Sequence, residues 1–99
     1  MVTYEDMIGR VTVVTGAASG IGRATAEGFA ENGAISVFAD INFEGASEAA
    51  NQVIEKGGKA FAVSIDVRNY EKIQETVRTV LDKYGHIDYW VNVAGGASR

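Results

Sequence analysis

Short apolar runs alternate with amphipathic segments along the chain, and this alternation restricts the fold more than any other feature. Runs rich in β-branched or aromatic residues are expected to form strands at 11–15, 34–40, 60–65 and 87–93. Helical spacing of apolar residues predicts helices over 21–32, from 42–44 to the glycines at 57–58, and from 70 to about 84. We therefore predict an α/β fold: a doubly wound parallel sheet in the strand order 3-2-1-4, with helices on both faces.

Each predicted helix is expected to bury one face against the sheet. In the first helix the expected inward residues are Ile21, Ala24, Thr25 and Phe29. In the second they are Ala46, Ala49, Ala50, Val53 and Ile54. In the third they are Ile73, Val77, Val80, Leu81 and Tyr84.

Composition narrows the classes of protein and partner. The 99 residues fit one domain or part of one. The net charge of −4 and the lack of a basic run argue against nucleic acid or an anionic membrane surface as partners. The chain has no cysteine, and its single histidine, His86, is interpreted as a solvated turn residue, so we predict no metal site. The sequence has no signal-like N-terminus and no run near the ~18 apolar residues of a membrane span, so we expect a cytoplasmic protein.

A glycine-rich turn, TGAASGIG from Thr15 to Gly22, joins the first strand to the first helix. Glycine permits positive φ and leaves no Cβ atom in the path of a pyrophosphate. The N-terminus of the helix offers N–H groups and the positive end of its dipole, and Gly22 would let this helix pack closely on the strand. The spacing G-x-x-x-G-x-G differs from G-x-G-x-x-G. Its place between a strand and a helix nevertheless indicates a dinucleotide site of Rossmann type rather than a plain structural turn.

Asp40 ends the second predicted strand, 20 residues after Gly20. A carboxylate at that edge of the sheet can accept hydrogen bonds from both hydroxyls of an adenosine ribose, and it would repel a 2′-phosphate. The alternative is a solvated acid or a helix cap, although Asn42 or Glu44 could fill the cap instead. No cation stands beside Gly20 or Asp40 in the sequence, and Arg23 lies within the helix, so we expect NAD rather than NADP.

Together with Asp66-Val67 and Asn92-Val93-Ala94-Gly95, these residues resemble the short-chain dehydrogenase/reductase family along the whole chain. The turn matches the family's T-G-x-x-x-G-I-G motif at every specified position. The resemblance implies that the Asp66 side chain and the Val67 main chain contact adenine. Val93 stands where the family usually has a second Asn whose side chain braces the centre of the sheet, which puts that brace in doubt, while its carbonyl can still reach the ribose. The cofactor-binding residues implied are Gly16, Ser19, Gly20, Ile21, Gly22, Asp40, Ile41, Asp66, Val67, Asn92, Val93, Ala94 and Gly95.

The family's catalytic signature, Tyr-x-x-x-Lys, does not occur in these 99 residues. The residues four positions after the tyrosines are Ile8, Gln74, Asp88 and Val93, and none is lysine. We therefore assign no catalytic residue. We expect residues 1–99 to be an NAD-binding Rossmann-type segment, truncated before the catalytic part and inactive by itself.

The expected function of the intact protein is that of an NAD-dependent oxidoreductase, which transfers a hydride between NAD(H) and a small-molecule alcohol or carbonyl substrate, in a homo-oligomer. One alternative is a nucleotide-binding half-domain with no catalysis of its own. Another is a different doubly wound enzyme such as a methyltransferase, against which the G-x-x-x-G-x-G spacing and the Asn-x-Ala-Gly turn argue. The identity of the substrate is left open.

Overall fold

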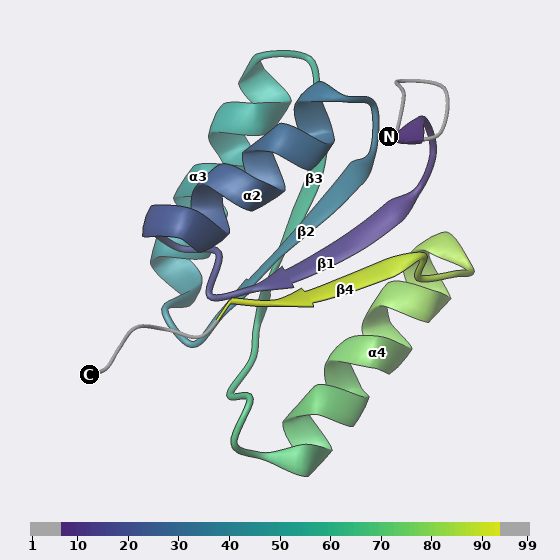
Figure 1. Ribbon diagram of the computed structural model, residues 1–99. Coiled ribbons are helices and arrows are strands. Elements are labelled where there is room, and N and C mark those ends of the chain that lie inside the picture. The colour runs from purple at the N-terminus through teal and green to yellow at the C-terminus, as the bar shows by residue number, and fades with distance from the viewer. Residues whose placement is uncertain (1–6, 94–99) are drawn as a thin grey trace.

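The computed structural model describes residues 7–93, which form one parallel sheet between two layers of helices (Figure 1). The elements are β1 (Val11–Thr15), α2 (Gly20–Glu31), β2 (Ile35–Asp40), α3 (Phe43–Glu55), β3 (Lys59–Ser64), α4 (Tyr70–Tyr84) and β4 (Tyr89–Asn92). Within these described residues, no helix has the length and apolar character needed to cross a membrane.

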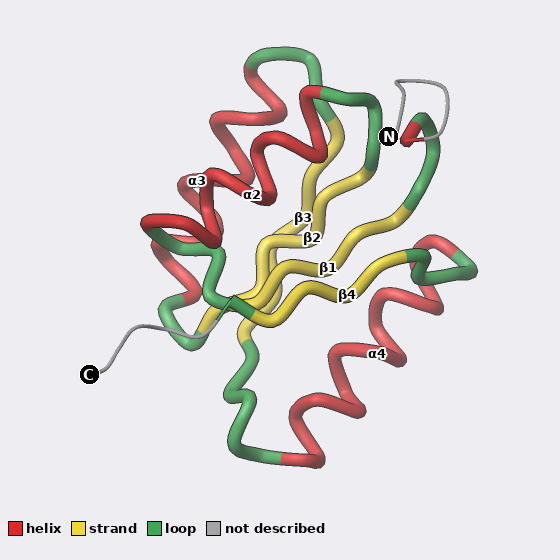
Figure 2. Tube along the Cα trace, viewed as in Figure 1, coloured by secondary structure: helices red, strands yellow, loops and turns green. Residues whose placement is uncertain are grey.

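The predicted strand order is confirmed. The sheet runs β3-β2-β1-β4 with every pair parallel, and Val13 of β1 lies opposite Val37 of β2 and Trp90 of β4. The chain moves outward from β1 through β2 to β3, and then returns to the other side of β1 as β4 (Figure 2). This reversal next to β1 creates the switch point at which doubly wound sheets bind their ligands, outside the carboxyl ends of the strands.

The core has one layer on each face of the sheet. On one face, Val14 and Phe38 pack against alanines of α2 and α3, among them Ala26 and Ala49. On the other face, Val11, Val13 and Val37 pack against Val80 of α4. Every residue of β1 is buried, as expected for the central strand of a sheet that is covered on both sides.

The predicted inward face of α2 is wrong for its first turns. The helix buries Gly22, Ala26 and Ala30, whereas Ile21 is 76% exposed and Ala24 is also exposed. The physical reason is the short distance between the helix and the turn that follows β1. Small residues spaced four apart permit that approach, and a branched side chain would prevent it.

The other two helices follow the prediction more closely. In α3 the four predicted residues Ala46, Ala49, Ala50 and Val53 are buried, but Ile54 is half exposed. In α4, Val80 is buried as predicted and Ile73 and Tyr84 pack against the same cluster. Leu81 is exposed and Thr76 is buried in α4, which corrects the prediction for that turn of the helix.

Both asparagines that could cap helices do so. The Asn42 side chain accepts a hydrogen bond from the Gly45 N–H at 3.1 Å, and the Asn69 side chain accepts one from the Lys72 N–H at 3.2 Å. These bonds satisfy backbone donors that a helix leaves without partners in its first turn. They therefore fix where α3 and α4 begin, just beyond the carboxyl ends of β2 and β3.

At the opposite, amino end of the sheet, Asp88 joins β1 to β4. Its carboxylate accepts a hydrogen bond from the Val11 N–H at 2.8 Å and lies 2.7 Å from Nδ1 of His86. The bond from the Val11 backbone, with smaller contributions from His86 and Arg10, holds the pKa of Asp88 below its ordinary value. β4 starts two residues later than predicted, because Ile87 and Asp88 form this junction instead of continuing the strand.

Gly22→Ala is expected to destabilise the fold by about 1–3 kcal/mol, the usual cost of overpacking a core. A Cβ atom at position 22 would overlap the backbone carbonyl of Gly16. Urea unfolding followed by the fluorescence of Trp90 measures the loss. Gly28→Ala is the matched control in the same helix, where a new Cβ atom has no atom within 4 Å. The Gly28→Ala variant should have a free energy of unfolding up to about 1 kcal/mol higher, because alanine favours the helix. Equal changes in stability in the two variants would contradict this account.

The outer edge of β4 has no neighbouring strand among the described residues, and it carries the exposed side chain of Tyr89. We expect the isolated 99-residue chain to self-associate through this edge, because unpaired backbone groups beside apolar side chains attract another strand. Sedimentation velocity at rising protein concentration tests this. Tyr89→Lys should shift the chain toward monomer, whereas Tyr70→Lys, on exposed α4 surface, should not. A monomer at every concentration in the unaltered chain would refute the prediction.

Candidate functional site at the carboxyl ends of the strands

The glycine-rich turn after β1 is held in place by the end of β2. The Asp40 carboxylate accepts a hydrogen bond from the Ala18 N–H at 2.9 Å, and the Ala39 carbonyl accepts one from the Ala17 N–H at 3.2 Å. Gly16 and Gly20 adopt φ of 72° and 61°, a region that favours glycine. Two backbone conformations and two hydrogen bonds therefore determine the path of the turn.

The three glycines of the turn serve three different purposes. A Cβ atom on Gly16 would lie 2.8 Å from the Val93 carbonyl oxygen, so the missing side chain allows the backbone of Val93, just after β4, to approach closely. Gly22 admits the backbone of the turn itself, which agrees with the close packing predicted for it. At Gly20 a Cβ atom would meet nothing within 4 Å, so the space beside it is open.

The N-terminus of α2 is left without a side-chain cap. Ser19 stands at the cap position, but its side chain makes no capping hydrogen bond, and the first turn of the helix contains no acidic residue. Such an end presents backbone N–H groups and a positive dipole to an anion. Ile21, the second residue of the helix, is largely exposed.

A pocket of about 230 Å³ opens at the carboxyl ends of the strands. Its lining comes from the segments that follow all four strands: Thr15, Gly16, Asp40, Ile41, Ile65, Asp66, Val67, Arg68 and Val93. Six of these belong to the predicted site: Gly16, Asp40, Ile41, Asp66, Val67 and Val93. Residues that are up to 78 positions apart in the sequence, Thr15 and Val93, therefore share one cavity.

Asp40 has a structural task in addition to the predicted one. Its Oδ2 accepts the Ala18 N–H, and its Oδ1 accepts the Asn42 N–H at 2.8 Å. Each carboxylate oxygen can accept about two hydrogen bonds, so both retain capacity for a further donor. The side chain thus lies in the pocket with its orientation fixed by the protein and with acceptor positions still available.

Asp66 forms a two-point ion pair with Arg68, two residues later. Nε of Arg68 lies 3.0 Å from Oδ1 and Nη2 lies 3.1 Å from Oδ2. Hydrogen bonds from the Arg68 side chain and then from its backbone N–H hold the pKa of Asp66 below its ordinary value. Asp66 is therefore an ionised acceptor at neutral pH.

Arg68 is the residue that sequence reasoning missed. No cation is adjacent to Gly20 or Asp40 in the sequence, but the fold brings Arg68 from the loop after β3 into the pocket that Asp40 lines. The signal that could have found it is the loop position itself, because loops after neighbouring parallel strands meet at one edge. Arg23 points elsewhere: its guanidinium contacts Glu27 on its own helix and Gln52 and Glu48 on α3.

A hydrogen bond between side chains links Asn92, at the end of β4, to β1. Its Oδ1 accepts hydrogen bonds from the Thr15 hydroxyl at 2.9 Å and from the Trp90 indole N–H at 3.1 Å. The sequence put the brace expected at position 93 in doubt because Val93 replaces an Asn there, and the hydrogen bond at Asn92 is a different link between β1 and β4, one residue earlier. Val93 itself lies against Gly16 through its backbone. Ala94 and Gly95, also predicted to bind the cofactor, lie outside the described residues.

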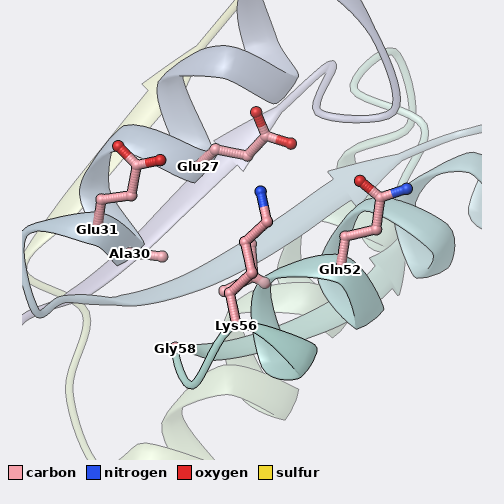
Figure 3. A pocket seen from close by; sticks show the side chains of 7 residues that line it. Glu27, Ala30, Glu31, Gln52, Lys56 and Gly58 are labelled. Atoms are coloured by element: carbon pink, nitrogen blue, oxygen red, sulfur yellow. The ribbon is translucent and has the colours of Figure 1, made fainter.

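A second hollow, of about 90 Å³, lies between α2 and α3 (Figure 3). Its polar lining includes Glu27 and Glu31 of α2 with Gln52 and Lys56 of α3. It shares no lining residue with the pocket at the strand ends and contains none of the predicted site residues. The strand-end pocket is thus the candidate site.

Comparison with known proteins places the chain in a family. A family model described as short chain dehydrogenase matches residues 10–99. The 3-hydroxyacyl-CoA dehydrogenase type-2 of Drosophila melanogaster is 40% identical over 88 residues, which cover 89% of this chain and 33% of that protein. Tropinone reductase-like 2 of Erythroxylum coca is 42% identical over 92 residues, which cover 93% of this chain and 32% of that protein.

The fold has close counterparts among solved structures. The crystal structure of a hydroxysteroid dehydrogenase from Escherichia coli superposes with a TM-score of 0.88 at 34% sequence identity, over 91% of this chain and 38% of that one. The chain spans about a third of the length of the curated relatives it matches. The family match, the sequence relatives and the shared strand order all agree with the resemblance inferred from the motifs. The chain belongs to the short-chain dehydrogenase/reductase family.

Proposed function

We propose that this chain supplies the dinucleotide site of an oxidoreductase that transfers a hydride between NAD(H) and an alcohol or carbonyl substrate. The observation that carries the proposal is the pocket at the strand switch point, where Gly16, Asp40, Asp66 and Val93 meet. Ligands of doubly wound sheets bind at this place, and family membership supports a nicotinamide cofactor as the ligand.

The described residues fit the parts of a nicotinamide dinucleotide. The open space at Gly20 and the uncapped start of α2 suit a pyrophosphate. Asp40, with acceptor positions still available, suits the two hydroxyls of the adenosine ribose. Asp66 and Val67 suit the adenine, as the family resemblance implies. When bound, the nicotinamide supplies or accepts the hydride, and the residues of this chain bind and orient the dinucleotide.

Asp40 supports NAD over NADP as the cofactor. An ionised carboxylate at the ribose would repel a 2′-phosphate and leave it without a partner. Arg68 is the basic residue among the described lining residues, and its guanidinium is already paired with both oxygens of Asp66. Asp66 therefore offsets the charge of the one basic side chain among these lining residues, and Asp40 adds a further negative charge to the same pocket.

The substrate is proposed only as a class. The relatives are named for hydroxyacyl-CoA, for a tropinone reductase and for a hydroxysteroid, which share an alcohol or carbonyl group as the reacting centre. We assign no catalytic residue to these 99 residues and expect no dehydrogenase turnover from them alone. Cytoplasmic location and homo-oligomeric assembly of the intact protein stay predictions from the sequence.

Asp40→Asn is expected to narrow the preference for NADH over NADPH by about 1–3 kcal/mol, the scale of one hydrogen bond to a charged group. Asparagine keeps the shape of the side chain and one of the two acceptor oxygens, but it loses the hydrogen bond from either the Ala18 or the Asn42 N–H. Urea unfolding of the variant measures that separate cost to the turn. Titrations that follow the fluorescence of bound NADH and NADPH measure the two affinities. Asp82→Asn, on the exposed side of α4, removes a charge away from the pocket and should leave the preference unchanged. Tighter binding of NADPH than NADH by the unaltered protein would refute the choice of NAD.

Gly20→Ala is expected to weaken NADH binding at least tenfold, because the methyl group would enter the space proposed for the pyrophosphate. It should also cost about 1–2 kcal/mol of stability, since a non-glycine residue would adopt positive φ. Gly57→Ala is the matched control: Gly57 also has positive φ, and a Cβ atom there also meets nothing within 4 Å, but it lies in the turn before β3. The control should lose similar stability with NADH affinity intact. If both variants lose affinity equally, the phosphate role of Gly20 is wrong.

A further inference from the structure

Hydrogen bonds hold the loop after β3 at both of its ends. The Ile65 N–H donates to the Asp40 carbonyl at 3.2 Å, so the loop starts beside the end of β2. The Asn69 N–H donates to the Asp66 carbonyl at 2.9 Å, which closes a tight turn, and Asn69 then caps α4. Asp66 and Arg68 are therefore held on a short turn that is anchored at both ends.

The carboxylate of Asp66 has one hydrogen-bond acceptor position left, and it lies on one of the two oxygens. Oδ1 accepts from the Arg68 backbone N–H and from Nε, both at 3.0 Å, while Oδ2 accepts only from Nη2, at 3.1 Å. Each oxygen can accept about two hydrogen bonds. One acceptor position is thus left on Oδ2, and the planar two-point pair with Arg68 fixes its direction.

Two apolar side chains beside this pair are exposed without serving the core. Ile41 is 64% exposed and Val67 is 52% exposed, and both line the strand-end pocket together with Arg68. Exposed apolar groups beside a planar cation make a surface suited to a flat, aromatic ligand that offers one hydrogen-bond donor. Adenine, with its exocyclic amine, has that chemistry.

We infer that Arg68 is a positioning residue for adenine: it orients the free acceptor position of Asp66 toward the exocyclic amine. This inference rests on the proposed dinucleotide function and names a residue that the family motif does not. Arg68 acts through Asp66, and it takes no part in hydride transfer. The competing role, a cation for a 2′-phosphate, would use the guanidinium N–H groups that the two-point pair with Asp66 leaves over.

The test compares NADH with reduced nicotinamide hypoxanthine dinucleotide, in which a carbonyl replaces the exocyclic amine. The unaltered protein should prefer NADH by about 10-fold or more, as expected for one hydrogen bond to a charged acceptor. Arg68→Gln removes the two-point pair and should reduce this preference to within about threefold. Arg68→Lys keeps the charge but not the planar pair, and it should reduce the preference as well, which separates orientation from charge.

Arg78→Gln is the matched control, because it removes an exposed arginine from α4 that does not line the strand-end pocket. It should leave the preference between the two dinucleotides unchanged. Circular dichroism and urea unfolding of each variant establish that the fold is intact. If the 99-residue chain self-associates, the same measurements are made on a chimera in which it replaces the segment it matches in the 7alpha-hydroxysteroid dehydrogenase of Escherichia coli.

The outcomes separate this inference from the proposed function. An unaltered preference for NADH in Arg68→Gln would overturn the role of Arg68 while leaving the dinucleotide site in place. A selective loss of NADPH affinity in the same variant would assign Arg68 to the 2′-phosphate instead and would also overturn it. Failure of the folded, unaltered protein to bind either dinucleotide would overturn the proposed function, and the inference with it.

Discussion

Three stretches of backbone meet at Gly16 with no room for a Cβ atom, and the rest of the structure depends on that close approach. The carbonyl of Gly16 lies against Gly22 of α2, and the carbonyl of Val93 lies over Gly16 itself. This contact determines how near α2 comes to the sheet. Because the two lie close together, α2 packs through the small residues Gly22, Ala26 and Ala30. It also brings the chain beyond β4 next to the turn after β1, which forms one wall of the pocket.

Asp40 links this packing to the candidate site. Because it bonds to the N–H groups of Ala18 and Asn42, the same carboxylate shapes the turn, supports the start of α3 and lines the pocket. Its removal would change the fold of the turn and the charge of the site together. Asparagine would keep one of these two hydrogen bonds and alanine would keep neither, so a measurement of cofactor choice on either variant needs a stability measurement beside it.

Local patterns in the sequence predicted much of the fold. Strand order followed from alternation and handedness, and the cap at Asn42 followed from residue type and position. The inward face of α2 was predicted correctly at Gly22 but wrongly at Ile21 and Ala24, because helical spacing of apolar residues takes no account of how closely two backbones approach. Arg68 was missed for a related reason: its place in the pocket depends on which loops lie side by side, and it is not a sequence neighbour of Gly20 or Asp40. The link at Asn92 depends on the Thr15 hydroxyl, which reaches it only once β4 lies beside β1.

The charges around the pocket explain how an acidic site could bind an anion selectively. Two carboxylates line it, yet Asp66 is neutralised at close range by Arg68, while the uncapped start of α2 favours negative charge at the turn. Asp40 is satisfied by neutral N–H groups alone, so its negative charge is not cancelled by a hydrogen-bonded cation. Since ionic interactions weaken with distance and screening, repulsion is strongest within a few ångströms of Asp40. A pyrophosphate at the helix end would be attracted, whereas a second phosphate beside Asp40 would be rejected, so the arrangement of paired and unpaired charge can separate two phosphates of one ligand.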